Sequence, residues 1–216
     1  MALANRVQII RAAHRIASVF DNNNKKYIIM GGGASIIQGS EERQTRDLDI
    51  NVLKMDDRLI AKMTAAGITV RPNRNTPKRW NATISESSPG AKNATSVDIA
   101  LRPDIKDVLE HAEIVDGVVV AGLHLLLVDK IKTMSSRGVV ASAKIETDLQ
   151  DVLFCTSEIE RRKKGFVPDN LKQTLTSDIW TKFWTQVLHA GRGAEDLVLI
   201  EEALRIEAGL DWPLRV

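Results

Sequence analysis

The sequence predicts an α+β fold with an appended helical C-terminal half. Short segments with strand-like patterns are confined to the part of the chain before residue 122. After that point, apolar residues recur with the three- and four-residue spacing of helices. We therefore expect two domains, a core over residues 1–122 and a helical domain over residues 123–216.

The first predicted element is an amphipathic helix. Ile9, Ala13, Ile16 and Phe20 are spaced four, three and four residues apart, which places them on one helix face. Residues 1–20 are also basic and contain no acid, as in a mitochondrial transit peptide. The apolar stripe and the single serine in this stretch favour the structural helix, and we expect a cytoplasmic protein, with a mitochondrial location as the alternative.

The next elements surround a run of three glycines. Residues 26–30 read as a short buried strand, and the glycines that follow read as a turn. Residues 34–38 suit a short helix. Residues 47–53 alternate polar and apolar side chains with a period of two, which predicts a half-buried strand.

The rest of the predicted core contains one helix and three strands. Asp56 is a candidate cap for a helix that ends near Ala66. Residues 68–71 suit an edge strand. Residues 79–86 and 95–101 suit two strands of a hairpin, because a Ser-Ser-Pro-Gly loop lies between them.

Four helical segments are predicted for the C-terminal half. They cover residues 123–136 and 144–164, an apolar stripe within 179–187, and another within 197–208. Pro168 breaks the chain between the second and third segments.

Composition excludes several classes of protein. The 216 residues are 44% hydrophobic and 27% charged, which is ordinary for a soluble globular protein. The formal net charge of +2 makes no global case for nucleic-acid or membrane binding. The single cysteine, Cys155, excludes an internal disulfide and a multi-cysteine zinc site. No apolar run reaches membrane-spanning length, so we expect no membrane partner.

Three aspartates form the candidate catalytic site. Asp47 and Asp49 alternate with apolar residues, so they share one face of their strand, and Asp98 lies opposite the apolar face of another. If the strands are neighbours, the three carboxylates converge. Hard oxygen ligands favour Mg²⁺ or Mn²⁺, and three acids are able to hold two such ions about 3.5–4 Å apart.

Gly31, Gly32 and Gly33 follow the first strand directly. Glycine lets the backbone approach a ligand closely, and exposed N–H groups at such a turn bind phosphate. A tight strand-to-helix connection is the structural alternative. Neither a Walker A motif nor a dinucleotide-binding motif fits these residues.

Together these residues resemble a known active-site signature. The spacing Gly31-Gly32-x-Ala34-x4-Gly39, followed by Arg43-x-Thr45-x-Asp47-x-Asp49 and a later acid at Asp98, is similar to that of the DNA polymerase beta-like nucleotidyltransferases. The most similar group is that of the abortive-infection type IV toxin nucleotidyltransferases. The resemblance implies a small mixed β-sheet nucleotidyltransferase core.

The resemblance also implies a substrate and a set of contacts. An NTP would be the substrate, with the metal held by Asp47, Asp49 and Asp98. The phosphates would be bound by the amides of the three glycines, by Arg43 and by Lys130. Arg43 and Thr45 have an equally strong structural reading, in which they brace the loop before the strand. Asp148 is either a surface partner of Lys144, four residues away on one helix, or part of the site wall.

The implied reaction moves a nucleoside monophosphate from the NTP to an acceptor and releases pyrophosphate. The acceptor stays open among RNA, a protein and a small molecule, and the oligomeric state is not predicted. A basic run beside Trp80 suits RNA; the run contains Arg71, Arg74, Lys78 and Arg79. A solvated loop with a core tryptophan is the preferred interpretation. A non-catalytic binder on the same fold is the main alternative function. A glycosyltransferase is less favoured because only 46 residues precede Asp47.

Overall fold

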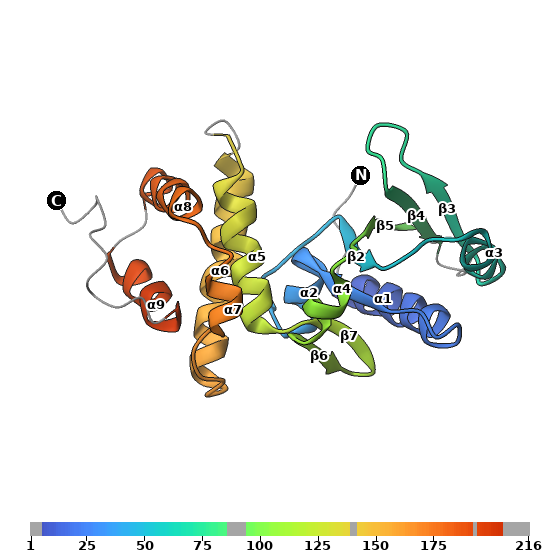
Figure 1. The fold of residues 1–216 in the computed structure, drawn as a ribbon, viewed down its shortest axis with the longest axis horizontal. Coiled ribbons are helices and arrows are strands. Elements are labelled where there is room, and N and C mark those ends of the chain that lie inside the picture. The colour runs from blue at the N-terminus through green and yellow to red at the C-terminus, as the bar shows by residue number, and fades with distance from the viewer. Residues whose placement is uncertain (1–5, 86–93, 139–141, 192–193, 205–216) are drawn as a thin grey trace. The chain divides into compact units, whose positions relative to one another are not determined.

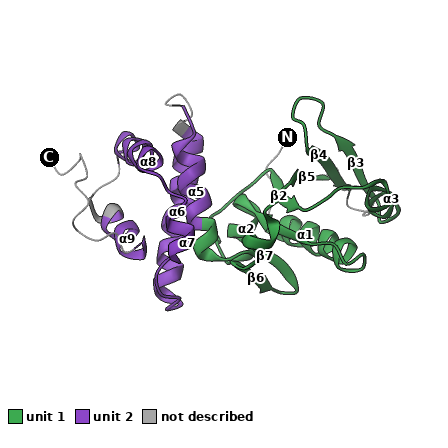
Figure 2. Ribbon diagram, viewed as in Figure 1, with its two compact units in different colours: residues 1–126 green, residues 127–216 purple. Residues whose placement is uncertain are grey.

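The computed structural model describes residues 6–85, 94–138, 142–191 and 194–204. The chain forms two compact units, residues 1–126 and 127–216 (Figure 2). The sequence placed the domain boundary after residue 122, where a helix begins. In the structure that helix, α5 (Leu123–Ser135), starts in the first unit and continues into the second.

One mixed sheet of seven strands organises the described part of the first unit (Figure 1). Its spatial order is β3-β4-β5-β2-β1-β7-β6. The β2–β5 and β1–β7 pairs are parallel, and the other neighbours are antiparallel. The predicted α+β fold with a mixed sheet is therefore confirmed. The strands are β1 (Tyr27–Met30), β2 (Asp47–Val52), β3 (Ile68–Pro72), β4 (Arg79–Ser85), β5 (Ala94–Leu101), β6 (Ala112–Val115) and β7 (Val118–Ala121).

The longer helices that pack against this sheet in the described part of the first unit are α1 (Arg6–Asp21), α2 (Gly31–Ile37) and α3 (Asp57–Ala65). The predicted stripe on α1 is fully buried, which confirms that segment as a core helix. The side chain of Asp56 caps α3 by accepting a hydrogen bond from the Leu59 amide at 2.9 Å. This cap is the one that the sequence predicted.

The elements between β5 and α5 were not predicted from the sequence. These are the short helix α4 (Ile105–Leu109) and the hairpin of β6 and β7. Asp116 and Gly117 join the two strands, and both have positive φ, at 50° and 76°. An Asp-Gly pair is a typical two-residue hairpin turn, so the signal was present in the sequence. The hairpin adds β7 beside β1 and makes β6 the edge strand on that side of the sheet.

The second unit is helical in its described part. It contains most of α5 and four further helices: α6 (Ser142–Arg161), α7 (Asp169–Lys172), α8 (Ser177–His189) and α9 (Ala194–Leu204). The predicted helices over 123–136 and 144–164 are confirmed as α5 and α6, and the stripe within 179–187 lies on α8. The predicted stripe within 197–208 extends beyond the described residues, and α7 was not predicted. No helix in the described ranges is long and apolar enough to cross a membrane.

Candidate active site

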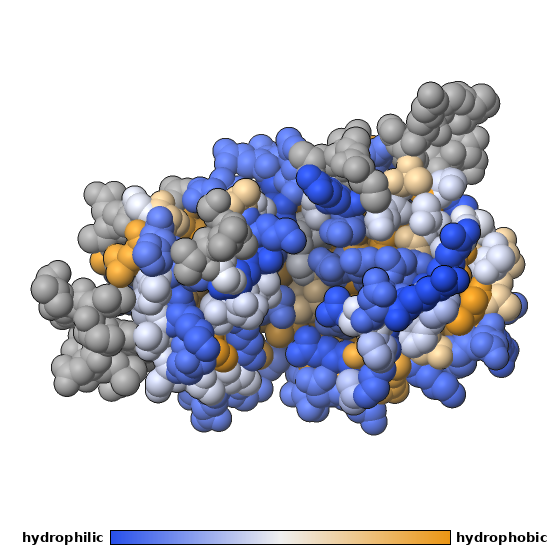
Figure 3. Space-filling view, turned by 90° about the horizontal axis from the view of Figure 1, so that it is seen from above, coloured by the Kyte–Doolittle hydropathy of each residue, from blue (hydrophilic) through white to orange (hydrophobic). Residues whose placement is uncertain are grey.

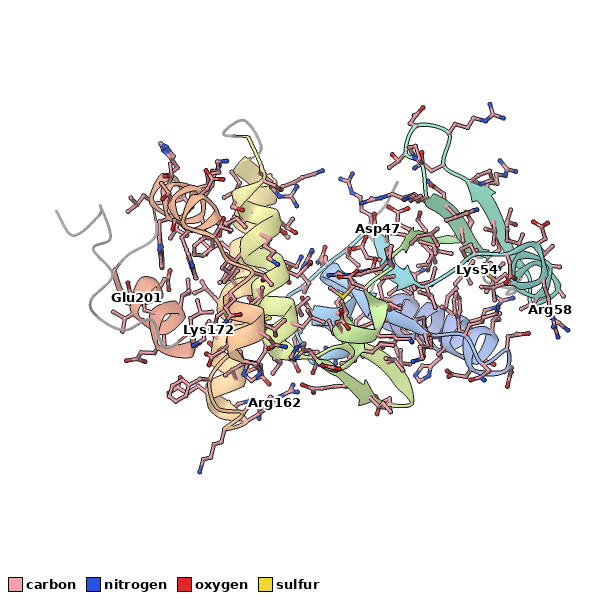
Figure 4. The ribbon with its side chains drawn as sticks, viewed as in Figure 1. Asp47, Lys54, Arg58, Arg162, Lys172 and Glu201 are labelled. Atoms are coloured by element: carbon pink, nitrogen blue, oxygen red, sulfur yellow. The ribbon has the colours of Figure 1, made fainter. Side chains whose placement is uncertain are left out.

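The three aspartates occupy adjacent positions on two neighbouring parallel strands. Asp49 on β2 is in register with Asp98 on β5, and Asp47 is in register with Ser96. Residues in register on adjacent strands project from the same face of a sheet. All three aspartates are half-buried, whereas the alternating residues on the other face are buried in the core: Leu48, Ile50, Val97 and Ile99. Figure 4 labels Asp47 at the start of β2.

The electrostatics of Asp98 reflect this crowding. Its pKa is raised above the ordinary aspartate value, first by burial and then by the negative charge of Asp47. The positive charge of Arg79 opposes the shift. Asp47 and Asp98 are therefore close enough to repel each other when both are ionised. A cation placed between them would relieve that repulsion.

The donor set suits a divalent cation chemically, since all three groups are carboxylates. The described residues nevertheless contain no group of three or more His, Cys, Asp or Glu side chains already gathered as a metal site. The strand register brings the three aspartates to neighbouring positions, and metal binding by Asp47, Asp49 and Asp98 stays a prediction.

The glycine run is helical in the structure. The sequence predicted a turn that precedes a helix at residue 34, but α2 begins at Gly31, directly after β1. A Cβ atom on Gly31 would lie 2.1 Å from Asp49 Oδ2, and one on Gly32 would lie 2.5 Å from Arg43 Nη2. Gly31 and Gly32 therefore allow one carboxylate and one guanidinium to approach the backbone closely.

Gly33 has a different neighbour from the other two glycines. A Cβ atom there would lie 2.6 Å from Leu48 Cδ1, and Gly33 itself is buried. The lack of a side chain at Gly33 is therefore explained by packing of α2 on the apolar face of β2. A phosphate contact by its amide stays a prediction.

Two residues of the loop before β2 support the site. The Arg43 guanidinium lies beside Gly32, and its Nη1 donates a hydrogen bond to the carbonyl oxygen of Gln44. The Thr45 hydroxyl lies 3.2 Å from the Asp47 carbonyl oxygen and 3.3 Å from its Oδ1. These contacts support the interpretation in which both residues brace the loop. They also place the Arg43 guanidinium beside Gly32, near the start of α2.

Replacing Gly31 with alanine tests whether the glycine positions Asp49. The new Cβ would meet the carboxylate, and Gly31 has φ of +62°, which L-residues rarely adopt. We expect the Gly31→Ala variant to lose about 1–3 kcal/mol of stability and to displace the Asp49 side chain. The free energy of unfolding in urea measures the first effect. Gly165→Ala is the matched control, because its φ of +74° is similar but, its chain neighbours aside, no atom of the described residues lies within 4 Å of its Cβ position. Equal losses in both variants would contradict a role of Gly31 in seating Asp49.

Lys130 lies in a buried ion-pair cluster of the second unit. Its Nζ is 2.7 Å from Asp151 Oδ2 and 3.4 Å from Asp148 Oδ1, and all three side chains are at most 6% exposed. Asp148 also pairs with Arg137 Nε. The reading of Asp148 as a surface partner of Lys144 is wrong, because Asp148 is buried against other partners and Lys144 is exposed. A phosphate contact by Lys130 stays a prediction.

Two residues beside these groups were given no role from the sequence. Asp151 is the nearer carboxylate partner of Lys130, but the two lie on different helices and no spacing rule links them. Asn81 on β4 is in register with Asp98, and so it lies on the same face as the aspartates. The alternation of polar and apolar residues along β4 was the available signal for Asn81.

Solved structures of other proteins share this fold, whereas sequence comparisons find no match. No protein-family model and no curated protein sequence matches the chain. An antigenic nucleotidyltransferase-like protein from Paracoccidioides brasiliensis matches 94% of this chain and 96% of its own, at 15% identity and a TM-score of 0.68. A candidate nucleotidyltransferase from Helicobacter pylori matches 92% and 94%, at 13% identity and a TM-score of 0.52.

The antibiotic-resistance factor ANT(2″)-Ia, solved in solution, matches 87% of this chain and 99% of its own. The identity is 13% and the TM-score is 0.51. These likenesses show that the chain has a nucleotidyltransferase-like fold. The narrower resemblance to the abortive-infection type IV toxin group stays a prediction.

Proposed function

We propose that the protein transfers a nucleoside monophosphate from an NTP to an acceptor, with divalent-metal dependence. The observation that carries this proposal is the register of Asp49 with Asp98, with Asp47 two residues away on the same face. The close approach of Gly31 to Asp49 places the start of α2 beside the carboxylates. The fold shared with nucleotidyltransferase-like proteins supports the same reading.

Each group has a proposed role. Asp47, Asp49 and Asp98 would hold Mg²⁺ or Mn²⁺, which when bound offsets the charge of the triphosphate and lowers the pKa of an acceptor hydroxyl. The amides of Gly31 and Gly32, with Arg43 beside them, would orient the phosphates, and Lys130 is proposed as a further phosphate contact. The acceptor oxygen bonds to the α-phosphorus while the α-phosphorus–oxygen bond to the β-phosphate breaks. Pyrophosphate leaves with that electron pair, and the hydroxyl proton passes to solvent or to a neighbouring carboxylate.

A non-catalytic nucleotide binder on the same fold is the alternative function. Retention of all three carboxylates favours catalysis, because a binder needs no acceptor-side acid. The glycosyltransferase reading is less supported, since the described strand order gives no nucleotide-binding parallel sheet upstream of Asp47.

A thermal-shift titration tests binding at this site. Mg²⁺ together with an NTP is expected to raise the melting temperature, because a ligand that binds the folded state stabilises it. At 100-fold excess over the dissociation constant the gain is about 2.7 kcal/mol, or about 5–10 °C for a chain of this size. Mg²⁺ without NTP should give a smaller rise, and EDTA should abolish both. No rise with any of the four Mg²⁺–NTP pairs at millimolar concentration would contradict the proposal.

A further inference from the structure

A row of polar residues extends from the aspartates toward the β3 edge of the sheet. Arg71 on β3 is in register with Asn81 on β4, and Asn81 is in register with Asp98. Asp98 is in turn in register with Asp49. The four residues therefore project from one face, on four successive strands. At about 4.8 Å per strand, Arg71 lies about 10 Å from Asp98 along this row.

A polar hollow lies on the outer part of the same face. It is lined by Thr69, Arg71, Asn81 and Thr83 and has a volume of about 420 Å³. Thr69 is in register with Thr83, and both pairs place their side chains on the acid-bearing face. All four residues are exposed. The hollow thus offers hydroxyl, amide and guanidinium groups on β4, which pairs with the strand that carries Asp98, and on β3 beyond it.

Four cationic side chains lie around this hollow without an ion-pair partner among the described residues. The residues that we call the basic hairpin surface are all exposed: Arg71, Arg74, Lys78 and Arg79. Within the part of the chain that the structure describes, their side chains form no ion pair. Arg79 does act on Asp98 through its charge, so the surface reaches the aspartates. Hydrophilic residues also cover much of the face of the first unit seen in Figure 3.

We propose that the basic hairpin surface and the hollow bind a single-stranded RNA whose terminal hydroxyl is the acceptor. This inference rests on the proposed function, since it names the acceptor of that reaction. Four cations spread over β3, the following turn and β4 match a polymer with repeated phosphates better than a molecule that carries one phosphate. They would also repel a cationic acceptor. The Asn81 amide and the two threonine hydroxyls are suited to hydrogen bonds with sugar hydroxyls and base edges.

Trp80 does not belong to this surface. Trp80 is in register with Ile99, which is buried, so its ring projects from the core-facing side of the sheet. Stacking of Trp80 on a bound base is therefore not supported, and the core reading of Trp80 is favoured. RNA binding here would depend on charge and hydrogen bonds.

Equilibrium binding of a fluorescent 12-nucleotide RNA of mixed sequence, measured by anisotropy without NTP, tests this proposal. The variant Arg71→Gln/Arg74→Gln removes two charges from the basic hairpin surface. We expect it to weaken binding about tenfold and to reduce the slope of log K against log salt by about 1.4, at about 0.7 per phosphate contact. Arg58→Gln/Lys62→Gln on α3 is the matched control, because it removes two exposed charges elsewhere in the same unit. Figure 4 labels Arg58 on that helix.

The outcomes separate this inference from the proposed function. Loss of RNA binding in the hairpin variant, with an unchanged control and an unchanged Mg²⁺–NTP thermal shift, supports the acceptor surface. Absence of RNA binding by the wild-type protein, or equal binding by wild type and the hairpin variant, overturns it. A failed Mg²⁺–NTP shift in the wild type would instead overturn the proposed function, whatever the RNA result.

Discussion

The Asp49→Asn variant is expected to lose nucleotidyl transfer by at least about 10²-fold while keeping its fold. An amide is a poor ligand for Mg²⁺ compared with a carboxylate, and metal stabilisation of developing charge contributes several kcal/mol. Each 1.36 kcal/mol lost from that stabilisation slows the reaction about tenfold. The change is close to isosteric on a half-buried polar face, so the far-ultraviolet circular dichroism should be unchanged. Initial rates with α-labelled NTP and total cell RNA or lysate measure the effect.

Asp107→Asn on α4 is the matched control for this prediction. Asp107 is exposed, lies in the same unit and undergoes the same change of charge. Its rate should stay within about twofold of wild type, as expected for a surface site. Full activity of Asp49→Asn would show that this carboxylate plays no part in the reaction, and the metal-dependent mechanism would then be wrong.

The Asp151→Asn variant is expected to lose about 3 kcal/mol of stability. Asp151 is 1% exposed, and its Oδ2 lies 2.7 Å from Lys130 Nζ. Replacing this carboxylate leaves the buried Lys130 ammonium without its nearer negative partner. Removing one partner of a buried ion pair costs about 3–5 kcal/mol, and the remaining Asp148 contact at 3.4 Å favours the lower end. For a chain of this size the melting temperature should fall by about 6–12 °C. Chemical and thermal denaturation measure the loss.

A double-mutant cycle shows whether the cluster is the cause. Lys130→Met/Asp151→Asn should be destabilised by less than the sum of its two single variants. In the double variant both charges of the pair are gone, so neither the ammonium nor the carboxylate stays buried without the other. Additive effects would contradict a direct Lys130–Asp151 coupling. The Lys130→Met variant also tests the proposed phosphate contact, since that contact predicts a weaker Mg²⁺–NTP thermal shift.

Local patterns in the sequence predicted much of the fold. The alternation over residues 47–53 predicted β2 and the face of its aspartates, and the cap at Asp56 predicted the start of α3. These features depend on a few neighbouring residues. The β6–β7 hairpin was missed although its Asp-Gly turn was readable, because the surrounding strands are only four residues long.

The site was only partly predictable, because its geometry depends on strand order. The register of Asp49 with Asp98 joins residues almost 50 positions apart, and periodicity fixes their faces but not their neighbours. The same limit explains why Asn81 and Arg71 were not placed in the row with the aspartates. For Asp148, the four-residue spacing to Lys144 suggested a surface pair, whereas tertiary packing buried the carboxylate against Lys130 and Arg137.

The most direct test of nucleotidyl transfer compares two labels on the same NTP. Wild-type protein is incubated with Mg²⁺, cell RNA or lysate, and NTP labelled either at the α-phosphate or at the γ-phosphate. Transfer of a nucleoside monophosphate predicts that the α-label stays on the acceptor and that the γ-label leaves as pyrophosphate, with both signals lost in Asp49→Asn. Retention of the γ-label on the acceptor, or no stable label with any of the four NTPs, would contradict the account.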